Sequence, residues 1–468
     1  MASPSPDPAT LMREAHALKA AGRLGEALSL YRQALSLNPA SAVADHNLAG
    51  ALGDAGRWRE AEPHLRSAFR KGLDAAETWL VLARCEEALG RQDAAEQAFE
   101  AAIARRRDLY DAHRELAQLR WMRDGDPDRA LDGLERARHA APEDVRLSVI
   151  RSEILSTAGR LQESADLLAG LCARAPGDGG LALLASQAAG AAGDASAALA
   201  YAERAAMRLP PHPPVLITLA EACLMTGDAR RAAAVAARLR ETAPANQHAI
   251  ALEATAMRLL GDPAYGELYD YPSLVKAFDI DAPAGWPDRA AYLQDLTDAL
   301  DAIHAYEAEP FHQSLRRGSQ AAHLLQAEHP AIRALPAALD GAVRRYIEGL
   351  GDGPDPLRGR RTEAYFIEGM WSVRLRPGGF HIDHVHPMGW ISSALHIRTV
   401  DRPGKEGWLR FGRPGVVTTP RLEAEYDVQP VAGRLVLFPA YMWHGTHPFE
   451  GEARRLTVAF DVLPGRRP

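Results

Sequence analysis

The chain has 468 residues, a length that predicts more than one domain. Of these residues 47% are hydrophobic and 25% charged, proportions typical of a globular protein. Its formal net charge is −7 and no long run of Lys or Arg occurs, which argues against a nucleic-acid-binding surface, because phosphate contacts need clustered cations. No stretch predicts a membrane span or a signal peptide. The three cysteines, Cys85, Cys172 and Cys223, lie far apart in apolar helical patterns. We therefore expect buried thiols in a reducing compartment, the cytoplasm by default.

The first half of the chain repeats with a period of 34 residues, with one step of 35. A glycine marks each repeat: Gly22, Gly56, Gly90, Gly125, Gly159, Gly193, Gly227 and Gly261. Five residues later comes a small residue: Ala27, Ala61, Ala95, Ala130, Ser164, Ala198 and Ala232. Five of the glycines are followed after 17 residues by a proline: Pro39, Pro142, Pro176, Pro210 and Pro244.

Each marker has a physical reason in a stack of helix pairs. Glycine ends a helix in the left-handed conformation, a small residue lets two helices approach closely, and proline falls in the turn between repeats. Over about residues 8–262 the pattern resembles the tetratricopeptide repeat (TPR) family. That resemblance implies an all-α superhelix that binds a protein or peptide partner on its concave face.

The next segment, residues 263–361, loses the period and reads as a mostly helical preface to a last domain. Helical spacing covers residues 288–304 and 331–350, the second with Pro336 as a possible break. Between them "FHQSLRRGSQAAHLL" holds many polar groups. It is either a solvated loop or a loop that covers the mouth of the last domain.

From residue 362 the hydrophobic period falls to two, which predicts strands. The runs are bounded by Gly and Pro and cover residues 365–377, 390–400, 408–412, 433–444 and 454–464. We therefore expect a β-sandwich or barrel over residues 362–468, after a helical array (1–262) and a preface (263–361). The predicted fold class is multidomain α + β.

The last domain contains no phosphate loop, G-x-S-x-G or C-x-x-C motif. Its histidines are therefore the candidate functional residues. Six are present: His381, His384, His386, His396, His444 and His447. Two ligands on an early strand, a third on a late strand and an arginine on the last strand form the layout of a non-haem Fe(II) site that binds 2-oxoglutarate. Three protein ligands leave open positions on the metal, and arginine binds a carboxylate with two parallel hydrogen bonds.

The region after residue 263 is similar to the 2-oxoglutarate/Fe(II) oxygenases that carry TPR repeats. The resemblance rests on "QSLRRGSQ", "MWSVRLRPGGFHIDHVHPMGWISS", "LRFGRPG" and "GRLVLFPAYMWHGTHPFEGEARRLTVAFDVLP". It implies a double-stranded β-helix (jelly-roll) core, bound Fe(II), and 2-oxoglutarate with O2 as cosubstrates.

Two sets of metal ligands compete in "GGFHIDHVHPMGW". The family's H-x-H-P unit falls on His384 and His386, with His444 as the distal ligand, and this is the set we favour. The wider superfamily's H-x-D motif falls on His381 and Asp383 instead, again with His444. If the stretch is a strand, the two pairs lie on opposite faces and exclude each other unless a bulge intervenes. Asp383 would then orient an imidazole rather than bind the metal.

The carboxylate of 2-oxoglutarate needs a cationic partner on the last strand. Arg454 would join the apolar face of that strand, whereas Arg455 shares the other face with Thr457, so we expect Arg455 and Thr457 to bind it. Arg455 as a surface ion-pair residue is the alternative, and Arg374 is a weaker candidate for contact with the substrate or the cosubstrate.

The other histidines and the aromatic residues are expected to be structural. His447 precedes a proline and is typical of a loop, and His396 lies in mid-strand, where we expect it to line the site or to be structural. The tryptophans of the domain are expected to pack its core: Trp371, Trp390, Trp408 and Trp443.

The resulting hypothesis is a 2-oxoglutarate- and Fe(II)-dependent dioxygenase, a hydroxylase, whose TPR superhelix recruits a protein or peptide. Two alternatives stay open. One is a non-catalytic TPR scaffold with a degenerate jelly-roll, and the other is a cupin-type metal dioxygenase that does not use 2-oxoglutarate.

Overall fold

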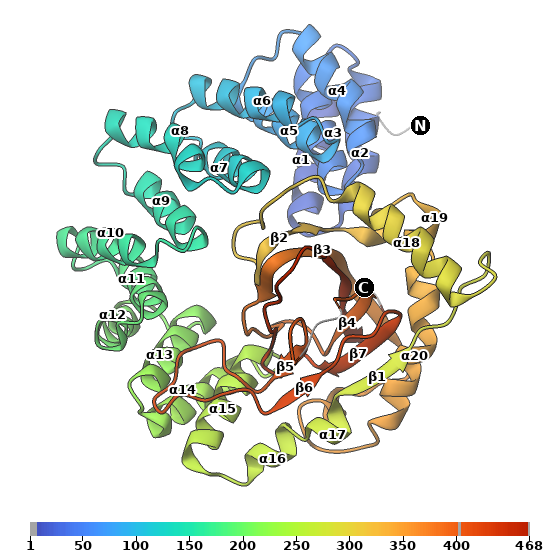
Figure 1. The fold of residues 1–468 in the computed structure, drawn as a ribbon. Helices are drawn as coiled ribbons and strands as arrows, with labels where there is room; N and C mark the ends of the chain where they lie inside the picture. Colours follow the sequence, from blue (N-terminus) through green and yellow to red (C-terminus); the bar gives the residue numbers. More distant parts are fainter. Residues whose placement is uncertain (1–6, 401–403, 467–468) are drawn as a thin grey trace, which may run out of the picture. The chain divides into compact units, whose positions relative to one another are not determined.

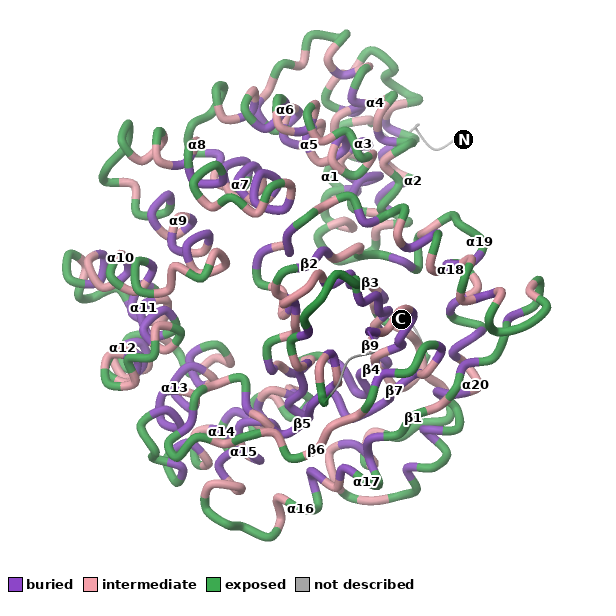
Figure 2. The backbone as a smooth tube through the Cα atoms, in the orientation of Figure 1, coloured by how far each residue is buried: buried purple, intermediate pink, exposed green. Residues whose placement is uncertain are grey.

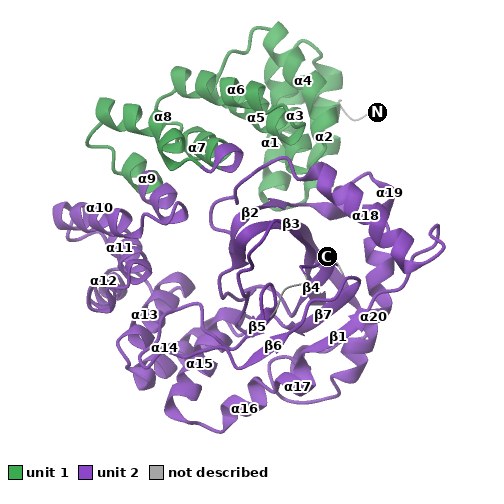
Figure 3. Cartoon of the chain, viewed as in Figure 1, with its two compact units in different colours: residues 1–121, 126–150 green, residues 122–125, 151–468 purple. Residues whose placement is uncertain are grey.

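The computed structural model describes residues 7–400 and 404–466. It separates into two compact units, residues 1–121 with 126–150, and residues 122–125 with 151–468 (Figure 3). The division falls inside the repeat array, so the later repeats form one unit with the strands. The boundaries at residues 262 and 361, which follow the sequence pattern rather than compactness, stay predictions.

The array consists of antiparallel helix pairs that follow the 34-residue period (Figure 1). In the first unit lie α1 (Pro8–Ala20), α2 (Leu24–Leu37), α3 (Ala42–Asp54), α4 (Trp58–Arg70), α5 (Ala76–Ala88), α6 (Gln92–Arg105), most of α7 (Tyr110–Asp124) and α8 (Pro127–Ala140). Helix α9 (Val145–Thr157) runs from one unit into the other. The second unit continues with α10 (Leu161–Arg174), α11 (Gly179–Ala192), α12 (Ala195–Arg208), α13 (Pro213–Met225), α14 (Ala229–Thr242) and α15 (Gln247–Leu260).

The sequence markers of the repeat occupy the places that their chemistry predicts. All eight marker glycines have positive φ angles, between 68° and 88°, a region that L-side chains rarely adopt. The seven small residues are at most 2% exposed, which lets the paired helices approach. The TPR fold is thereby confirmed. The three cysteines are buried and unpaired as expected, and no described helix has the length and apolarity to cross a bilayer.

The preface is less helical than predicted. It contains α16 (Ala264–Leu268), α17 (Tyr271–Leu274), β1 (Lys276–Asp279), α18 (Arg289–Ile303), β2 (Leu315–Ala321), η1 (Leu324–Gln326), α19 (Pro330–Arg333), α20 (Leu335–Gly349) and η2 (Arg358–Arg360). The two strands were not predicted. Pro336 lies in the first turn of α20, where its missing N–H has no helical partner to lose, so it starts the helix instead of breaking it.

The last domain is built from two antiparallel sheets (Figure 1). Its strands are β3 (Tyr365–His381), β4 (Ile391–Arg398), β5 (Leu409–Phe411), β6 (Tyr426–Val428), β7 (Arg434–Pro439), β8 (His444–Thr446) and β9 (Arg455–Pro464). The large sheet has the order β1-β7-β4-β9-β3-β2, and the small one β6-β5-β8. This arrangement confirms the predicted jelly-roll class, with the two strands of the preface forming both edges of the large sheet.

Strand β9, buried along much of its length (Figure 2), divides its residues between the two faces of the large sheet. Leu456, Val458, Phe460 and Val462 are fully buried, and they share a hydrophobic cluster with residues of α18 and α20. The alternate residues of β9 turn the other way, into a cavity between the sheets. Period-two alternation therefore gives this strand one face for the core and one face for a site.

Candidate metal centre

Three histidines meet on the wall of this cavity, whose volume is about 530 Å³. His384, His386 and His444 each offer one ring nitrogen, and these three atoms lie within 4.8 Å of one another. Three imidazole nitrogens at such spacing can bind one divalent transition-metal ion and leave further coordination positions open.

The backbone that carries these histidines is not the continuous strand that the alternation argument assumed. Strand β3 ends at His381, and the next residues are irregular except for one bridge. In that bridge the N–H of His384 donates to the carbonyl oxygen of His444 at 2.9 Å, and the reverse bond is 3.1 Å long. The N–H of His386 donates to the Ala440 carbonyl oxygen at 3.0 Å. Because the strand has ended, the face rule does not hold here, and His381 lines the same cavity.

Each of the three imidazoles has its Nδ1 bound to an oxygen. His384 Nδ1 lies 2.8 Å from the Ile382 carbonyl oxygen, and His444 Nδ1 lies 2.9 Å from that of Met442. His386 Nδ1 lies 2.8 and 2.9 Å from the two carboxylate oxygens of Asp461. Since these oxygens only accept, Nδ1 carries the proton in each ring. Nε2 is left with its lone pair, ready to bind a metal.

Burial keeps the rings of His384 and His444 uncharged. It lowers the pKa of His384 to about 4, with the neighbouring His386 ring adding to the effect. Burial likewise holds the pKa of His444 well below the ordinary value. At neutral pH both imidazoles are therefore in the neutral form that metal ligation requires.

Asp461 orients His386, and its removal is expected to weaken the metal site. In Asp461→Ala the His386 ring loses the acceptor that fixes its tautomer, so we expect the metal dissociation constant to rise roughly 10- to 100-fold. Titration with Mn(II) followed by electron paramagnetic resonance measures it. Asp427→Ala is the matched control, because Asp427 binds His447 Nε2 at 2.7 Å outside the cluster. Equal losses in the two variants would contradict a specific role for Asp461.

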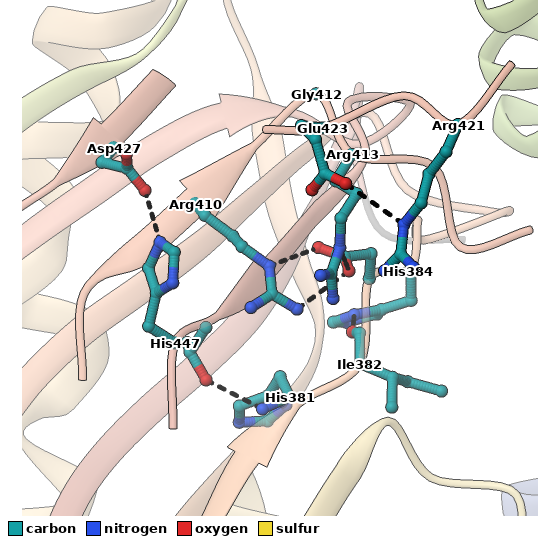
Figure 4. A network of polar contacts seen from close by, with 12 residues as sticks. His381, Ile382, His384, Arg410, Gly412, Arg413, Arg421, Glu423, Asp427 and His447 are labelled. Atoms are coloured by element: carbon teal, nitrogen blue, oxygen red, sulfur yellow. Dashed lines mark hydrogen bonds and ion pairs between the residues drawn. The ribbon is translucent and has the colours of Figure 1, made fainter. Parts of the chain in front are cut away.

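Asp383 lies beside the cluster but is bound elsewhere. Its carboxylate accepts from Arg410 Nε and Nη2 at 2.8 and 2.9 Å and from Arg413 Nε at 2.6 Å (Figure 4). The side chains of Asp383 and Arg410 are only 3% and 4% exposed. Asp383 thus pairs with two arginines, and the carboxylate that orients an imidazole, that of His386, belongs to Asp461 instead.

Arg455 projects from β9 into the cavity and is 1% exposed. Its Nη2 lies 3.3 Å from His396 Nδ1, while Nε and Nη1 have no hydrogen-bond partner among the described residues. Burial lowers the pKa of Arg455 to about 10, so the guanidinium is still charged at neutral pH. An unpaired buried cation is costly, and a carboxylate bound in the cavity would satisfy it with two parallel hydrogen bonds. Thr457 lines the cavity two residues further along the strand.

Arg374 is not part of this cavity. Its Nη2 donates to the His304 carbonyl oxygen at 2.8 Å, and Nη1 lies 3.7 Å from Asp301. On β3 it lies directly opposite Leu456 of β9, whose side chain is on the other face of the sheet from Arg455. The side chain of Arg374 therefore points away from Arg455. The expectation that Arg374 contacts the cosubstrate is therefore corrected: it holds α18 against the sheet.

The remaining histidines make structural contacts, and one tryptophan borders the cavity as well as the core. His447 is bound to Asp427 (Figure 4), and His396 is fully buried beside Arg455. Trp371 packs against the hydrophobic cluster that contains Val373 and Leu375, and it also lines the cavity and stacks on His386, with 5.7 Å between ring centroids.

The polar stretch of the preface is a strand rather than a loop in its centre, because β2 pairs with β3. Gln313, Ser314 and Gln320 nevertheless line the cavity. Ser314 Oγ lies 3.0 Å from His381 Nδ1, which ties this edge of the sheet to the histidine segment.

Comparisons with known proteins agree with the two-part organisation. The model of the family described as "Putative 2OG-Fe(II) oxygenase" matches residues 369–461. Two models of the tetratricopeptide repeat match residues 46–112 with 122–179, and residues 18–70 with 191–255. No curated protein matches the chain.

Three solved structures illustrate the range of similarity. A tetratricopeptide repeat protein from Parabacteroides merdae is 16% identical over 53% of this chain and 98% of its own, with a TM-score of 0.39. A TPR protein from Thermus thermophilus is 22% identical over 39% and 98%, with a TM-score of 0.32. A prolyl-4-hydroxylase from Pseudomonas putida is 19% identical over 42% and 97%, with a TM-score of 0.30.

Proposed function

We propose that this chain, which joins tetratricopeptide repeats to a domain of the 2OG-Fe(II) oxygenase family, hydroxylates a substrate with Fe(II), 2-oxoglutarate and O2. One observation carries the proposal. The three-histidine cluster and the buried Arg455, two of whose donors have no partner among the described residues, line the same cavity. A metal site alone needs no such cation, whereas a dicarboxylate that also binds the metal does.

The residues present fit the implied groups. Imidazole nitrogen is a suitable ligand for Fe(II), and His384, His386 and His444 would hold the ion. The guanidinium of Arg455, with the hydroxyl of Thr457, would hold the far carboxylate of 2-oxoglutarate. When bound together, iron and 2-oxoglutarate supply the activation of O2 that converts a C–H bond into C–OH with release of succinate and CO2.

The protein's own part is to position these groups and exclude water. Asp461 fixes the tautomer and direction of His386, and the neighbouring carbonyl oxygens do the same for His384 and His444. Apolar side chains also line the cavity, among them Trp371, Val373, Leu409 and Phe438. In such surroundings the attraction between Arg455 and a carboxylate is little screened.

The test is succinate release by the full-length chain that depends on both Fe(II) and 2-oxoglutarate. In Arg455→Met we expect the KM for 2-oxoglutarate to rise roughly 10- to 100-fold, because two charge-assisted hydrogen bonds are lost, with the metal affinity unchanged. Arg454→Met is the control, since Arg454 is the exposed residue that directly precedes the strand.

The outcomes separate the alternatives. A purified protein that binds no metal and releases no succinate would be a scaffold with a degenerate jelly-roll. Oxidation that requires metal but ignores both 2-oxoglutarate and the Arg455 substitution would be that of a cupin-type dioxygenase.

We further propose that the repeats recruit the substrate, a protein or peptide, and that the chain works in the reducing cytoplasm. Three buried, unpaired cysteines support a reducing location. Crosslinking of the full-length chain to candidate substrates, with turnover measured in parallel, tests whether the bound partner is also the one oxidised.

A further inference from the structure

The last helix of the array, α15, contacts the segment that carries the distal histidine. Trp443 directly precedes His444 and is 4% exposed. Its indole Nε1 donates to Thr255 Oγ1 at 2.9 Å and lies 3.3 Å from the Ala251 carbonyl oxygen, both on α15. The ring of His248, from the first turn of the same helix, packs edge-on against the indole with 5.4 Å between centroids.

The same helix also contacts the segment that carries His386. The N–H of Gln247, at the first position of α15, donates to the carbonyl oxygen of Pro387 at 2.9 Å. A first-turn N–H has no partner inside its own helix, so this bond satisfies it and fixes the residue after His386. Gln247 is 1% exposed, which means that water is no substitute for the bond.

A third contact reaches the His384 segment indirectly. Arg258 Nη1 donates to the Gly412 carbonyl oxygen at 2.8 Å, and the N–H of Gly412 donates to the carbonyl oxygen of Trp443 at 2.9 Å. The next residue, Arg413, binds Asp383, the neighbour of His384 (Figure 4). Both ligand-bearing segments, the one with His384 and His386 and the one with His444, are thus tied to one helix of the repeat array.

We propose that α15 is a positioning element of the metal centre, and that Thr255 is a positioning residue that acts through Trp443 on His444. The inference rests on the proposed metal site. A rigid helix sets the spacing of Gln247, Thr255 and Arg258, and hence of the chain segments that they hold. The last repeat is then part of the catalytic scaffold as well as of the partner-binding array.

The physical reason is the narrow geometric tolerance of a three-ligand site. Because His444 follows Trp443 directly, a rotation of the indole moves the His444 backbone and with it the ring nitrogen. The hydroxyl of Thr255 is the side-chain acceptor that holds the indole in place, and it donates in turn to the Ala251 carbonyl oxygen at 2.7 Å. Removing an outer partner of a metal ligand typically costs 10- to 100-fold in metal affinity.

Thr255→Val in the full-length chain tests the proposal, because valine keeps the shape and removes the acceptor. We expect the dissociation constant for Mn(II) to rise roughly tenfold and the visible absorption bands of bound Co(II) to shift. Thr255→Ser, which retains the hydroxyl, should restore both. Trp443→Phe removes the donor instead and should reproduce the effect of Thr255→Val.

Thr218→Val is the matched control. Thr218 is also 2% exposed, lies on α13 and accepts a side-chain hydrogen bond, from Gln187 Nε2 at 3.2 Å, away from the ligand-bearing segments. It should lose a similar amount of thermal stability and leave Mn(II) affinity and the Co(II) spectrum as in the wild type.

Two results overturn the inference in distinguishable ways. If the wild type binds Mn(II) and both Thr255→Val and Trp443→Phe bind it equally well with the same Co(II) spectrum, α15 does not position the site, although the proposed function stands. If the wild type itself binds no metal, the proposed function fails together with this inference.

Discussion

Replacing His444 with alanine is expected to abolish functional metal binding. His444 is the one ligand from its part of the chain, and its ring lies 4.2 Å from that of His384 and 5.2 Å from that of His386. If a bound ion gains roughly 10 kcal/mol from three ligands, each supplies about 3 kcal/mol, and loss of one weakens binding about a hundredfold or more. Mn(II) titration of the full-length variant measures this loss, and succinate release should fall to background.

His447→Ala is the control, because His447 lies three residues further on and is bound to Asp427. It should keep wild-type metal affinity. The same experiment separates the two ligand sets that the H-x-D-H-x-H stretch allows. Metal binding that survives in His384→Ala and His386→Ala but disappears in His381→Ala would assign the site to the other pair.

The repeat array was predictable because each marker has a local cause. Gly193, for example, ends α11 with a φ of 88°, a conformation that the sequence can signal through a single residue type. Strands β3, β4, β5, β7 and β9 were predictable for a similar reason, since alternation or apolar runs report them directly. Strands β6 and β8 and the two edge strands were missed, although the predicted run 433–444 reaches the first residue of β8. β1 has only four residues, and β2, "LRRGSQA", is too polar to stand out.

Only those features of the site that follow from local sequence pattern were predictable. The histidine cluster and the cavity-facing side of β9 follow from the H-x-H-P unit and from period-two alternation. The alternation argument fails after His381, where the chain leaves β3, and nothing in the stretch marks that point. Asp461 stands on the cavity-facing side of β9, yet its contact with His386 spans 75 residues, and the contact of Arg410 with Asp383 spans 27. Partners at such separations follow from the fold, which places two strands side by side.

Replacing Asp383 with alanine is expected to cost stability rather than metal affinity. The variant leaves Arg410, which is only 4% exposed, as a buried cation without its carboxylate. Breaking a buried pair in this way costs about 3–5 kcal/mol, because the remaining charge is neither paired nor hydrated. The free energy of unfolding from urea denaturation, recorded on the full-length chain, measures the change. Asp132→Ala provides the reference, since its partner Arg136 is 66% exposed and such pairs contribute no more than about 1 kcal/mol.

The double variant Asp383→Leu with Arg410→Met separates charge burial from metal binding. Removing both partners leaves no buried unpaired charge, and Arg413, with a side chain 30% exposed, can turn to water. We therefore expect most of the lost stability to return. Because Asp383 lies outside the histidine cluster, the refolded double variant should bind Mn(II) within about tenfold of the wild type. A stable double variant that has lost Mn(II) binding altogether would instead make Asp383 a ligand, and would restore the H-x-D pair as the metal site.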